Sequence, residues 1–391
     1  MRVLFLAHAY PRFSGDPVGS FVGNLAVALR EHGVQVTVSA PSAPGLSAFE
    51  EIDGIPIHRF RYAPTKHETL AYTGTMGAQV RDTTIGKLAM ASYLAAAYRA
   101  ASRQVRAAKF DLMHAHWWFP AGLVSSIVRR RHAVPYLVTM HGSDLRLASS
   151  FPMGESLYRT VATHAGAMSA VSTWLARAAE RMVPSVPVTV APMPVMSGLF
   201  HKGDAHDADR LLFIGKLTEQ KGLHRLLRAM TRMRSRTTLT VVGAGRVDDS
   251  ALKQLASDLG LGDRIEWLPL LTQEELAAQY RRAAVHVVPA LDEGLGLTAV
   301  ESLLSETPVV GFASGGLPDI VLEGATGRLV PAGDESALAA ALDDVLANPD
   351  ARLAMGAAGR AHALRLFGPD AAATRYVALY QDVLRGSRAA R

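Results

Sequence analysis

Short apolar runs alternate with longer amphipathic stretches along the whole chain. The runs are apolar at consecutive positions, which is typical of strands in a parallel sheet that is covered on both faces, and the stretches between them carry apolar residues at helical spacing. This alternation predicts an α/β protein with two Rossmann-like, doubly wound parallel sheets. The expected strands are residues 2–7, 34–39, 111–115, 136–141, 167–172 and 188–191, followed by 210–215, 238–243, 265–268, 285–289 and 308–312.

The second half of the chain repeats the pattern of the first. Arg2-Val-Leu-Phe-Leu-Ala7 and Arg210-Leu-Leu-Phe-Ile-Gly215 begin alike, and a length of 391 residues also favours two domains over one. A segment rich in Pro, Gly and charge at residues 192–209 predicts a hinge, and two domains imply a ligand cleft. The expected parts are an N-terminal domain at 1–195, a C-terminal domain at 205–368 and a final helix at 369–391 that crosses back to the first domain.

The composition is that of a globular protein without disulfides. Hydrophobic residues make up 49% and charged residues 19%, and no run reaches the roughly 18 apolar residues that a membrane-spanning helix needs. The apolar start is too short for the core of a signal peptide, and the absence of cysteine fits a reducing compartment, so we expect a soluble cytoplasmic protein. The charge is uneven, because residues 1–200 hold 19 Lys and Arg against 11 Asp and Glu, and the remainder holds 22 against 24.

Two basic clusters lie in the first half. Arg99, Arg103 and Arg106 share one face of an expected helix, and Arg129-Arg-Arg131 ends a later one. These clusters are either a solvated surface or a site of peripheral docking to anionic lipid headgroups at the inner face of the membrane, and the sequence leaves both interpretations open. Nucleic acid is not an expected partner, because the basic residues are dispersed and no aromatic run for base stacking accompanies them.

Two carboxylates bracket a glycine-containing turn in the second half. Glu293 follows an expected strand and Glu301 lies about one turn inside the next helix, so both can face one ligand. The backbone N–H groups at Gly296, Leu297 and Thr298 suit the oxygen atoms of a sugar or a phosphate. Glu301 lies among core-type residues, where an unpaired carboxylate is costly, and ligand hydroxyls would satisfy it.

This segment resembles the Glu-x7-Glu motif of retaining glycosyltransferases with the GT-B fold, particularly family 4, the glycosyltransferase group 1 domain. Four further segments follow the usual order of that family, namely 213–222, 241–245, 315–319 and 324–334. The combination is far more specific than any one glycine pattern. The resemblance implies a retaining hexosyltransferase that uses a UDP- or GDP-linked sugar and a hydroxyl acceptor, in glycoconjugate, polysaccharide or glycolipid biosynthesis.

The resemblance also assigns roles on the donor side. Lys216 and Lys221 correspond to the cationic pair that contacts the donor diphosphate, with Lys216 in the place of a more usual Arg, and Glu293 orients the donor sugar. The mechanism is expected to be front-side, with the donor phosphate taking the acceptor proton, so no protein base is assigned. The further donor-binding residues are Gly19, Gly215, Gly243, Leu268, Gly296, Leu297, Thr298 and Glu301, the last of them at the ribose hydroxyls.

Two turns of the first domain complete the expected site. Gly19 lies in the loop 10–21 after the first strand, where the family analogy brings backbone against the donor phosphate. His141 ends a buried strand and resembles the family's histidine turn beside the reacting sugar carbon. His116 and Trp117 are expected to line the acceptor side or to support His141.

Two further features of the sequence are a segment that resembles a metal-binding motif and an acidic residue at an expected helix end. Asp207-Ala-Asp209 beside His206 resembles a metal-binding DxD motif, but we interpret it as a solvated linker outside the predicted crevices, and expect no metal or other cofactor. Glu306 stands where the family often has Gly, and we expect it at a helix end, paired with a cation.

Two alternatives from other classes remain. A nucleotide-sugar epimerase or isomerase of the same shape would convert the donor without an acceptor, and a non-catalytic binding protein would bind the donor without turnover. The sequence does not encode the base and sugar of the donor, the acceptor (lipid-linked, saccharide or small molecule), the linkage or the oligomeric state.

Overall fold

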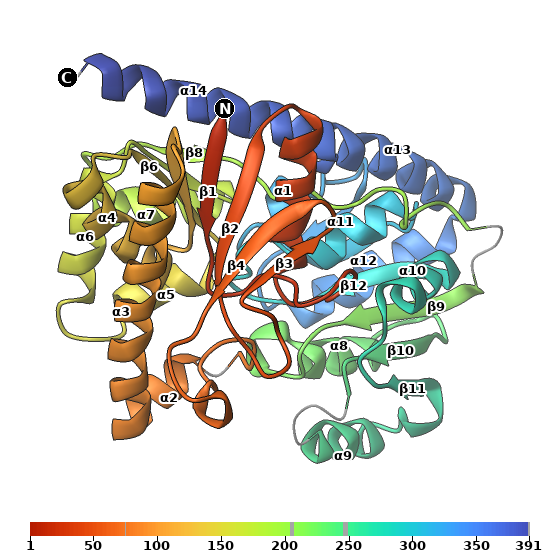
Figure 1. Cartoon of the computed structure of the whole chain (residues 1–391). Coiled ribbons are helices and arrows are strands. Elements are labelled where there is room, and N and C mark those ends of the chain that lie inside the picture. The colour runs from red at the N-terminus through yellow and green to blue at the C-terminus, as the bar shows by residue number, and fades with distance from the viewer. Residues whose placement is uncertain (75, 204–206, 245–248, 390–391) are drawn as a thin grey trace. The chain divides into compact units, whose positions relative to one another are not determined.

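The computed structural model describes residues 1–74, 76–203, 207–244 and 249–389. The chain divides into two compact units, of which unit 1 comprises Met1–Pro194 with Pro369–Arg391 and unit 2 comprises Val195–Gly368. Each unit is a sheet with helices on both faces (Figure 1), which confirms the predicted pair of Rossmann-like domains. The segment expected as a hinge contains residues 204–206, which lie outside the described residues.

The sheet of unit 1 has the strand order β3-β4-β2-β1-β5-β6-β7-β8. Its strands are β1 (Arg2–Leu6), β2 (Gln35–Pro41), β3 (Phe49–Ile52), β4 (Ile55–Phe60), β5 (Leu112–His116), β6 (Tyr136–Met140), β7 (Ala167–Ala170) and β8 (Val188–Val190). The strand pairs are parallel except for β3 with β4, a hairpin at the sheet edge that the apolar pattern did not predict. Asp53 and Gly54 form its turn with φ of 51° and 73°, the conformation that a two-residue hairpin turn requires.

Helices cover both faces of this sheet. α1 (Ser20–Glu31) packs on α14 (Pro369–Ala389), and α3 (Thr84–Ala107) packs on α4 (Leu123–His132). The two pairs lie on opposite faces because right-handed crossovers that run in opposite directions along a sheet place their helices on opposite sides. The other helices of unit 1 are α2 (Met76–Asp82), α5 (Ser143–Ala148), α6 (Gly154–His164) and α7 (Thr173–Met182).

The last helix belongs to unit 1, as predicted for a helix that crosses back. Tyr376 and Tyr380 of α14 are fully buried. The Tyr380 hydroxyl lies 2.8 Å from His114 Nδ1, and the Tyr376 hydroxyl donates to the Ala191 carbonyl at 2.8 Å. These contacts anchor α14 to β5 and to the residue that follows β8.

Unit 2 is a parallel six-stranded sheet with the order β11-β10-β9-β12-β13-β14. Its strands are β9 (Asp207–Ile214), β10 (Thr238–Val242), β11 (Ile265–Leu268), β12 (Ala283–Val288), β13 (Val309–Phe312) and β14 (Gly327–Val330). Its helices are α8 (Leu223–Met230), α9 (Ser250–Asp258), α10 (Gln273–Arg282), α11 (Leu297–Leu304), α12 (Glu335–Ala347) and α13 (Pro349–Phe367). The strand β14 was not predicted, and the other five agree with the expected strands to within a few residues.

Asp207 and Asp209 lie in β9 and not in a linker, which corrects the interpretation of that segment. The Asp207 carboxylate pairs with Arg210 at 3.3 Å and with Arg282 at 3.1 Å, so cations of the unit already occupy it. His206 lies outside the described residues. In the part of the chain that the structure describes, no group of three or more His, Asp or Glu is arranged to hold a metal ion.

Glu306 follows the end of α11 and its carboxylate lies 3.6 Å from the Lys202 ammonium, which confirms the expected pairing with a cation. Its φ of 59° is in the left-handed region, which explains why glycine suits this position in the family.

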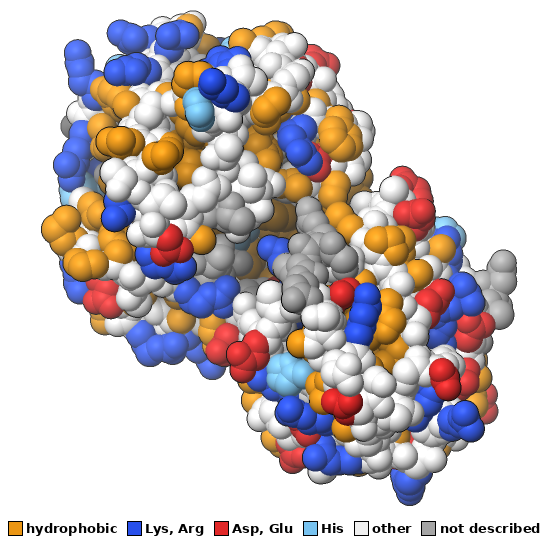
Figure 2. Space-filling model, turned by 90° about the horizontal axis from the view of Figure 1, so that it is seen from below, with side chains coloured by type: hydrophobic (Ala, Val, Ile, Leu, Met, Phe, Trp, Pro, Cys, Tyr) orange, Lys and Arg blue, Asp and Glu red, His pale blue; other side chains and the backbone are white. Residues whose placement is uncertain are grey.

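The surface carries both signs of charge. Figure 2 shows Lys and Arg side chains dispersed among apolar and polar ones on the visible face and not gathered into a single continuous patch. Among the described residues, no helix is long and apolar enough to cross a membrane.

The order of strands fixes where ligands can bind in each unit. In unit 1 the chain leaves β1 toward β2 and later returns to β5 on the other side, and in unit 2 it does the same around β9 with β10 and β12. At such switch points the loops after the two central strands run apart and leave a crevice at their carboxyl ends. The candidate site residues should therefore follow β1 and β5, and β9 and β12.

We expect Tyr380→Phe to lower the free energy of unfolding of the full chain by about 1 to 3 kcal/mol, because it leaves the buried His114 Nδ1 without its partner. Urea denaturation measures this cost. Tyr98→Phe is the matched control, since Tyr98 is only half-buried and its hydroxyl has no hydrogen bond among the described residues. Equal stability of the two variants would contradict the role of the Tyr380 hydroxyl.

Candidate functional site

An ion pair joins the two loops at the switch point of unit 2. The Lys221 ammonium lies 2.7 Å from Glu293 Oε2, and both side chains remain about one quarter exposed, at 27% and 23%. Lys221 ends the short 3-10 turn Glu219–Lys221 after β9, and Glu293 lies in the loop after β12. The structure therefore brings together two of the predicted site residues from distant parts of the sequence.

The backbones of these two loops are in direct contact. Gly222 has a φ of 76°, and a Cβ atom there would lie 2.0 Å from the Pro289 carbonyl oxygen. The Leu291 N–H donates to the Gln220 carbonyl at 3.0 Å, and the Gln220 side chain donates to the Asp292 carbonyl at 3.0 Å. Only glycine fits at position 222, and its absence of a side chain allows the loops to hold the ion pair in register.

The predicted donor-binding residues Gly215, Gly243 and Leu268 lie side by side at the ends of β9, β10 and β11. The N–H of Gly243 donates to the Leu268 carbonyl at 3.1 Å. Gly243 has a φ of 116°, and a Cβ atom there would lie 2.4 Å from the Gly215 carbonyl oxygen. The three residues thus form a floor of close-packed backbone, which is the kind of surface that a planar or anionic ligand can approach.

The start of α11 lies directly after Glu293. Gly296 caps this helix with a φ of 96° and no side chain accepts a hydrogen bond there. The N–H groups of the first turn, at Leu297 and Thr298, lack intrahelical acceptors, as at any helix N-terminus. The loop is supported from behind, because the Gly316 N–H donates to the Glu293 carbonyl at 2.8 Å. Glu293, Leu297 and Thr298 are half-buried, so the turn remains open to a ligand.

Glu301 has a partner that the sequence did not reveal. The hydroxyl of Tyr280, on α10 and fully buried, donates to Glu301 Oε2 at 2.8 Å. Burial raises the pKa of the Glu301 carboxyl to about 7, and the hydrogen bond from Tyr280 opposes this rise only in part. The expected ligand hydroxyls are therefore not the only groups that can satisfy this carboxylate.

A buried histidine lies close to the ion pair. His286 of β12 is fully buried, its ring packs edge-on against Tyr280, and neither ring nitrogen has a hydrogen-bond partner among the described residues. Burial, followed by the nearby charge of Lys221, lowers the pKa of His286 to about 3. The imidazole is thus neutral at physiological pH and adds no positive charge beside Lys221.

The Lys216 side chain is exposed and has no ion pair or hydrogen bond among the described residues, although its backbone carbonyl accepts from the Thr218 N–H at 2.8 Å. It follows Gly215 directly, at the carboxyl end of β9. The charge of Lys216 is therefore uncompensated at the same strand end where Lys221 is paired with Glu293.

The candidate residues of unit 1 form a cluster of aromatic rings at the ends of β1, β5 and β6. His116 Nδ1 lies 3.2 Å from His141 Nε2, and the Trp117 ring lies 4.5 Å from the His141 ring. His116 and Trp117 thus contact His141, as expected for residues that support it. Two further rings of the cluster were not predicted, namely His8, whose ring lies 4.0 Å from that of Trp117, and Phe21, whose ring lies 5.0 Å from that of His141.

These histidines are neutral at physiological pH. Burial lowers the pKa of His8 to about 4 and holds the pKa values of His116 and His141 well below the usual range. Neighbouring histidines make a smaller contribution, from His114 and His8 at His116 and from His116 and His8 at His141. A neutral imidazole has one N–H donor and one acceptor nitrogen, so it can orient a hydroxyl group without adding charge.

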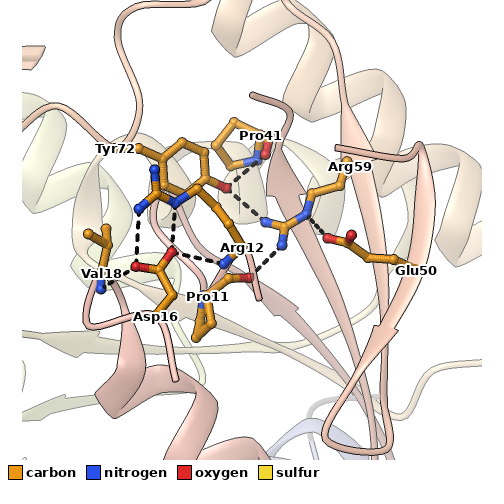
Figure 3. A network of polar contacts seen from close by, with 8 residues as sticks. All are labelled: Pro11, Arg12, Asp16, Val18, Pro41, Glu50, Arg59 and Tyr72. Atoms are coloured by element: carbon orange, nitrogen blue, oxygen red, sulfur yellow. Dashed lines mark hydrogen bonds and ion pairs between the residues drawn. The ribbon is translucent and has the colours of Figure 1, made fainter. Parts of the chain in front are cut away.

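The loop after β1 is built around the buried carboxylate of Asp16 (Figure 3). This carboxylate accepts from the N–H groups of Arg12 and Val18 at 3.0 and 3.1 Å and from the Arg12 guanidinium at 2.6 and 3.1 Å. Burial alone would raise the pKa of the Asp16 carboxyl, but the hydrogen bonds to Arg12 and Val18 bring a net decrease. Asp16 therefore holds the loop closed on itself.

Gly19 ends this loop and caps α1 with a φ of 76°. A Cβ atom there would lie 2.8 Å from the carbonyl group of Ala9, so the position needs glycine for close packing within the loop. This requirement exists without any ligand, and a contact of Gly19 with the donor phosphate remains a prediction.

We expect the stability of the chain to fall as the pH rises through the pKa of Glu301, and Glu301→Gln to remove that dependence. The folded chain raises this pKa from 4.5 to about 7. The Glu301 carboxyl therefore contributes its full stabilisation below pH 4.5, and this contribution of roughly 3 kcal/mol to the free energy of unfolding is lost as the pH rises through about 7. Urea denaturation of both proteins at pH 5 and pH 8 measures the difference, with the exposed Glu274→Gln as control. Parallel curves for the wild type and Glu301→Gln would contradict the raised pKa.

Comparison with known proteins agrees with this geometry. The chain matches the family described as "Glycosyl transferase 4-like domain" over residues 18–194 and the family described as "Glycosyl transferases group 1" over residues 200–362. The D-inositol 3-phosphate glycosyltransferase of Frankia alni is 32% identical over 308 residues, which cover 70% of this chain and 75% of that protein. The protein of the same name in Streptomyces scabiei is 30% identical over 321 residues, which cover 72% of this chain and 70% of that one.

Solved structures show the same fold over nearly the whole chain. Sucrose-phosphate synthase from Thermosynechococcus elongatus has a TM-score of 0.80 at 22% identity and covers 98% of this chain and 99% of its own. Anabaena HepE in complex with UDP and glucose has a TM-score of 0.72 at 17% identity, with 97% and 99% coverage. Together with the family matches, these likenesses show that the chain belongs to the glycosyl transferases group 1 family and is a glycosyltransferase of the GT-B type.

Proposed function

We propose that this glycosyltransferase transfers a hexosyl group from a UDP- or GDP-linked sugar to a hydroxyl acceptor with retention of configuration. The observation that carries the proposal is the ion pair of Lys221 with Glu293 at the switch point of unit 2, beside the unpaired Lys216. A donor diphosphate needs cations at this strand end, and a donor sugar needs a hydrogen-bond acceptor for its hydroxyls. The structure of HepE was solved with UDP and glucose, which supports a nucleotide-linked donor.

In this proposal the donor diphosphate binds to the Lys221 ammonium on the side away from Glu293. Lys221 then carries a carboxylate on one side and a phosphate on the other, and Lys216 supplies a second cation. The N–H groups at the start of α11 point at further oxygen atoms, as helix N-termini do in other phosphate sites. His286 is neutral, so it does not repel the Lys221 ammonium, and the positive charge at this strand end comes from Lys216 and Lys221.

The reaction breaks the bond between the anomeric carbon and the donor phosphate oxygen, and the acceptor oxygen attaches to the same face of the sugar. The acceptor proton moves to the leaving diphosphate, whose growing charge Lys216 and Lys221 stabilise. Glu293 and Glu301 both come from the segment between β12 and the first turns of α11. A hydrolytic pair would instead flank the scissile bond from opposite sides, so this placement favours transfer.

We assign His141 to the hydrogen bonding of a sugar or acceptor hydroxyl in unit 1. It is neutral at physiological pH and held by His116 and Trp117, so its orientation is fixed. The relatives from Frankia and Streptomyces are named for glycosyl transfer with D-inositol 3-phosphate, a polyol derivative, which supports a hydroxyl acceptor. We also propose a cytoplasmic location on the basis of the cysteine-free sequence.

Lys221→Gln, Glu293→Gln and His141→Ala are each expected to lower turnover by roughly 100-fold or more, because each removes a group that orients or stabilises the reacting atoms. A screen of UDP- and GDP-sugars by thermal shift identifies the donor, and proton NMR of the product gives its anomeric configuration. Lys202→Ala is the matched control, since this lysine pairs with Glu306 outside the site.

The alternatives give different results in the same assay. Conversion of the donor sugar to its epimer without an acceptor would replace transfer by epimerisation, and tight donor binding without any turnover would mean a binding protein. Inversion at the anomeric carbon would contradict the retaining mechanism, and normal turnover in all three variants would contradict the assigned site.

A further inference from the structure

Unit 1 has a groove that the proposed reaction does not use. It lies between the hairpin β3–β4 and α3, and its volume is about 430 Å³. Its lining residues come from β3, β4, the residues next to these strands and the second half of α3. None of them belongs to the loops after β1, β5 or β6, where the histidine cluster lies.

The groove is lined by basic residues and by no acidic residue. Two of its four arginines are already compensated, because Arg59 pairs with Glu50 at 2.6 Å and Arg61 lies 3.2 Å from Glu68. Figure 3 shows the Arg59 guanidinium directed at Glu50, Tyr72 and the Pro11 carbonyl.

The other two arginines, Arg99 and Arg103, lie one turn apart on α3 and are exposed. Among the residues that the structure describes, neither side chain has an ion pair or a hydrogen bond beyond the backbone bonds of the helix. Their guanidinium groups are free to bind an anion, and planar guanidinium groups suit the oxygen atoms of a phosphate.

A buried amide provides the second, independent indication of a ligand. Gln104 also lines the groove, and only 8% of it is exposed. Its carbonyl oxygen has no hydrogen-bond partner among the described residues. An unpaired buried acceptor costs about 1 to 3 kcal/mol, and a ligand hydroxyl in the groove would satisfy it once the side-chain amide turns toward the groove.

The remaining lining gives the groove its shape. Ala96 and Ala100 have small side chains on the same helix face as Gln104, which leaves depth between α3 and the sheet. At the opposite wall the rings of Phe49 and His58 lie 5.1 Å apart, and 58% of Phe49 is exposed. Aromatic rings beside a polar floor suit the apolar face of a compact polyol or sugar ring.

We propose that this groove binds a phosphate ester that carries free hydroxyl groups, with its phosphate at Arg99 and Arg103 and a hydroxyl at Gln104. The volume of about 430 Å³ is within the range of small-molecule sites and has room for a compound of the size of a hexose phosphate. A phosphate ester with free hydroxyl groups occurs both in a soluble sugar phosphate and in the headgroup of phosphatidylglycerol. The site is separate from the donor and acceptor residues of the proposed reaction.

The test measures binding of three probes to the full-length chain by calorimetry and sedimentation in low salt. The probes are glucose 6-phosphate, inorganic phosphate and vesicles of phosphatidylglycerol in phosphatidylcholine. We expect the double variant Arg99→Gln with Arg103→Gln to weaken binding of glucose 6-phosphate or of the vesicles at least tenfold, and the probe that is affected identifies the soluble or the lipid source. Gln104→Leu should weaken the hydroxylated probe and leave inorganic phosphate unchanged.

Two control variants separate the groove from general electrostatic attraction and from the donor site. Arg106→Gln removes an exposed cation of the same helix that does not line the groove, and it should change binding less than twofold. Lys221→Gln should leave binding intact.

Three results would overturn the proposal. The first is absence of binding of both hydroxylated probes to the wild type, and the second is an equal loss in Arg106→Gln and in the double variant. The third is a parallel loss of transfer activity in the double variant at saturating donor and acceptor, which would make the groove part of the acceptor site.

Discussion

The ion pair between Lys221 and Glu293 joins the two loops that meet at the switch point of unit 2, and the proposed donor-side chemistry depends on it. The lysine comes from the turn after β9 and the glutamate from the loop after β12, and Gly222 lets the two backbones touch. Without a ligand, each charge neutralises the other in a half-buried position. A bound diphosphate would share the ammonium with Glu293, so the carboxylate both positions Lys221 and limits how strongly it attracts an anion.

The two units share the same kind of switch point, but the residues there create different electrostatic environments. Unit 2 gathers charges at its switch point, namely Lys216, Lys221 and Glu293. In unit 1 the corresponding strand ends carry histidines that burial keeps neutral, and His116 and His141 are in contact at the ends of β5 and β6. The proposed transfer from a charged donor phosphate to an uncharged hydroxyl acceptor needs this difference, because cations stabilise the leaving group and neutral imidazoles orient a hydroxyl without competing for the phosphate.

Most of the fold follows from the apolar pattern, because strands buried on both faces are continuous apolar runs. The hairpin β3–β4 was not predicted because its edge strand Phe49–Ile52 is Phe-Glu-Glu-Ile, which is neither a continuous apolar run nor a regular alternation, although the Asp53-Gly54 turn signal was present in the sequence. The motifs placed Lys221 and Glu293 at strand ends, but the contact between them depends on which strands become neighbours. That neighbour relation is a property of the tertiary structure.

Of the other site residues, two carried no local signal in the sequence and one did. Tyr280 is one apolar-face residue of an ordinary amphipathic helix, and only the packing of α10 on α11 brings its hydroxyl to Glu301. Asp16 also carries no signal in the sequence that its carboxylate accepts hydrogen bonds from the N–H groups of its own loop. His8 was detectable, since it follows β1 at the carboxyl end where site residues are expected.

The most direct test of the central claim is the dissociation constant of UDP or GDP, whichever binds, for the wild type, Lys221→Gln and Glu293→Gln. If Lys221 is shared between Glu293 and the diphosphate, Lys221→Gln weakens nucleotide binding, and Glu293→Gln strengthens it by releasing the ammonium and removing a nearby negative charge. Equal weakening in both variants would contradict the account, because it would mean that the pair only maintains the structure of the loops.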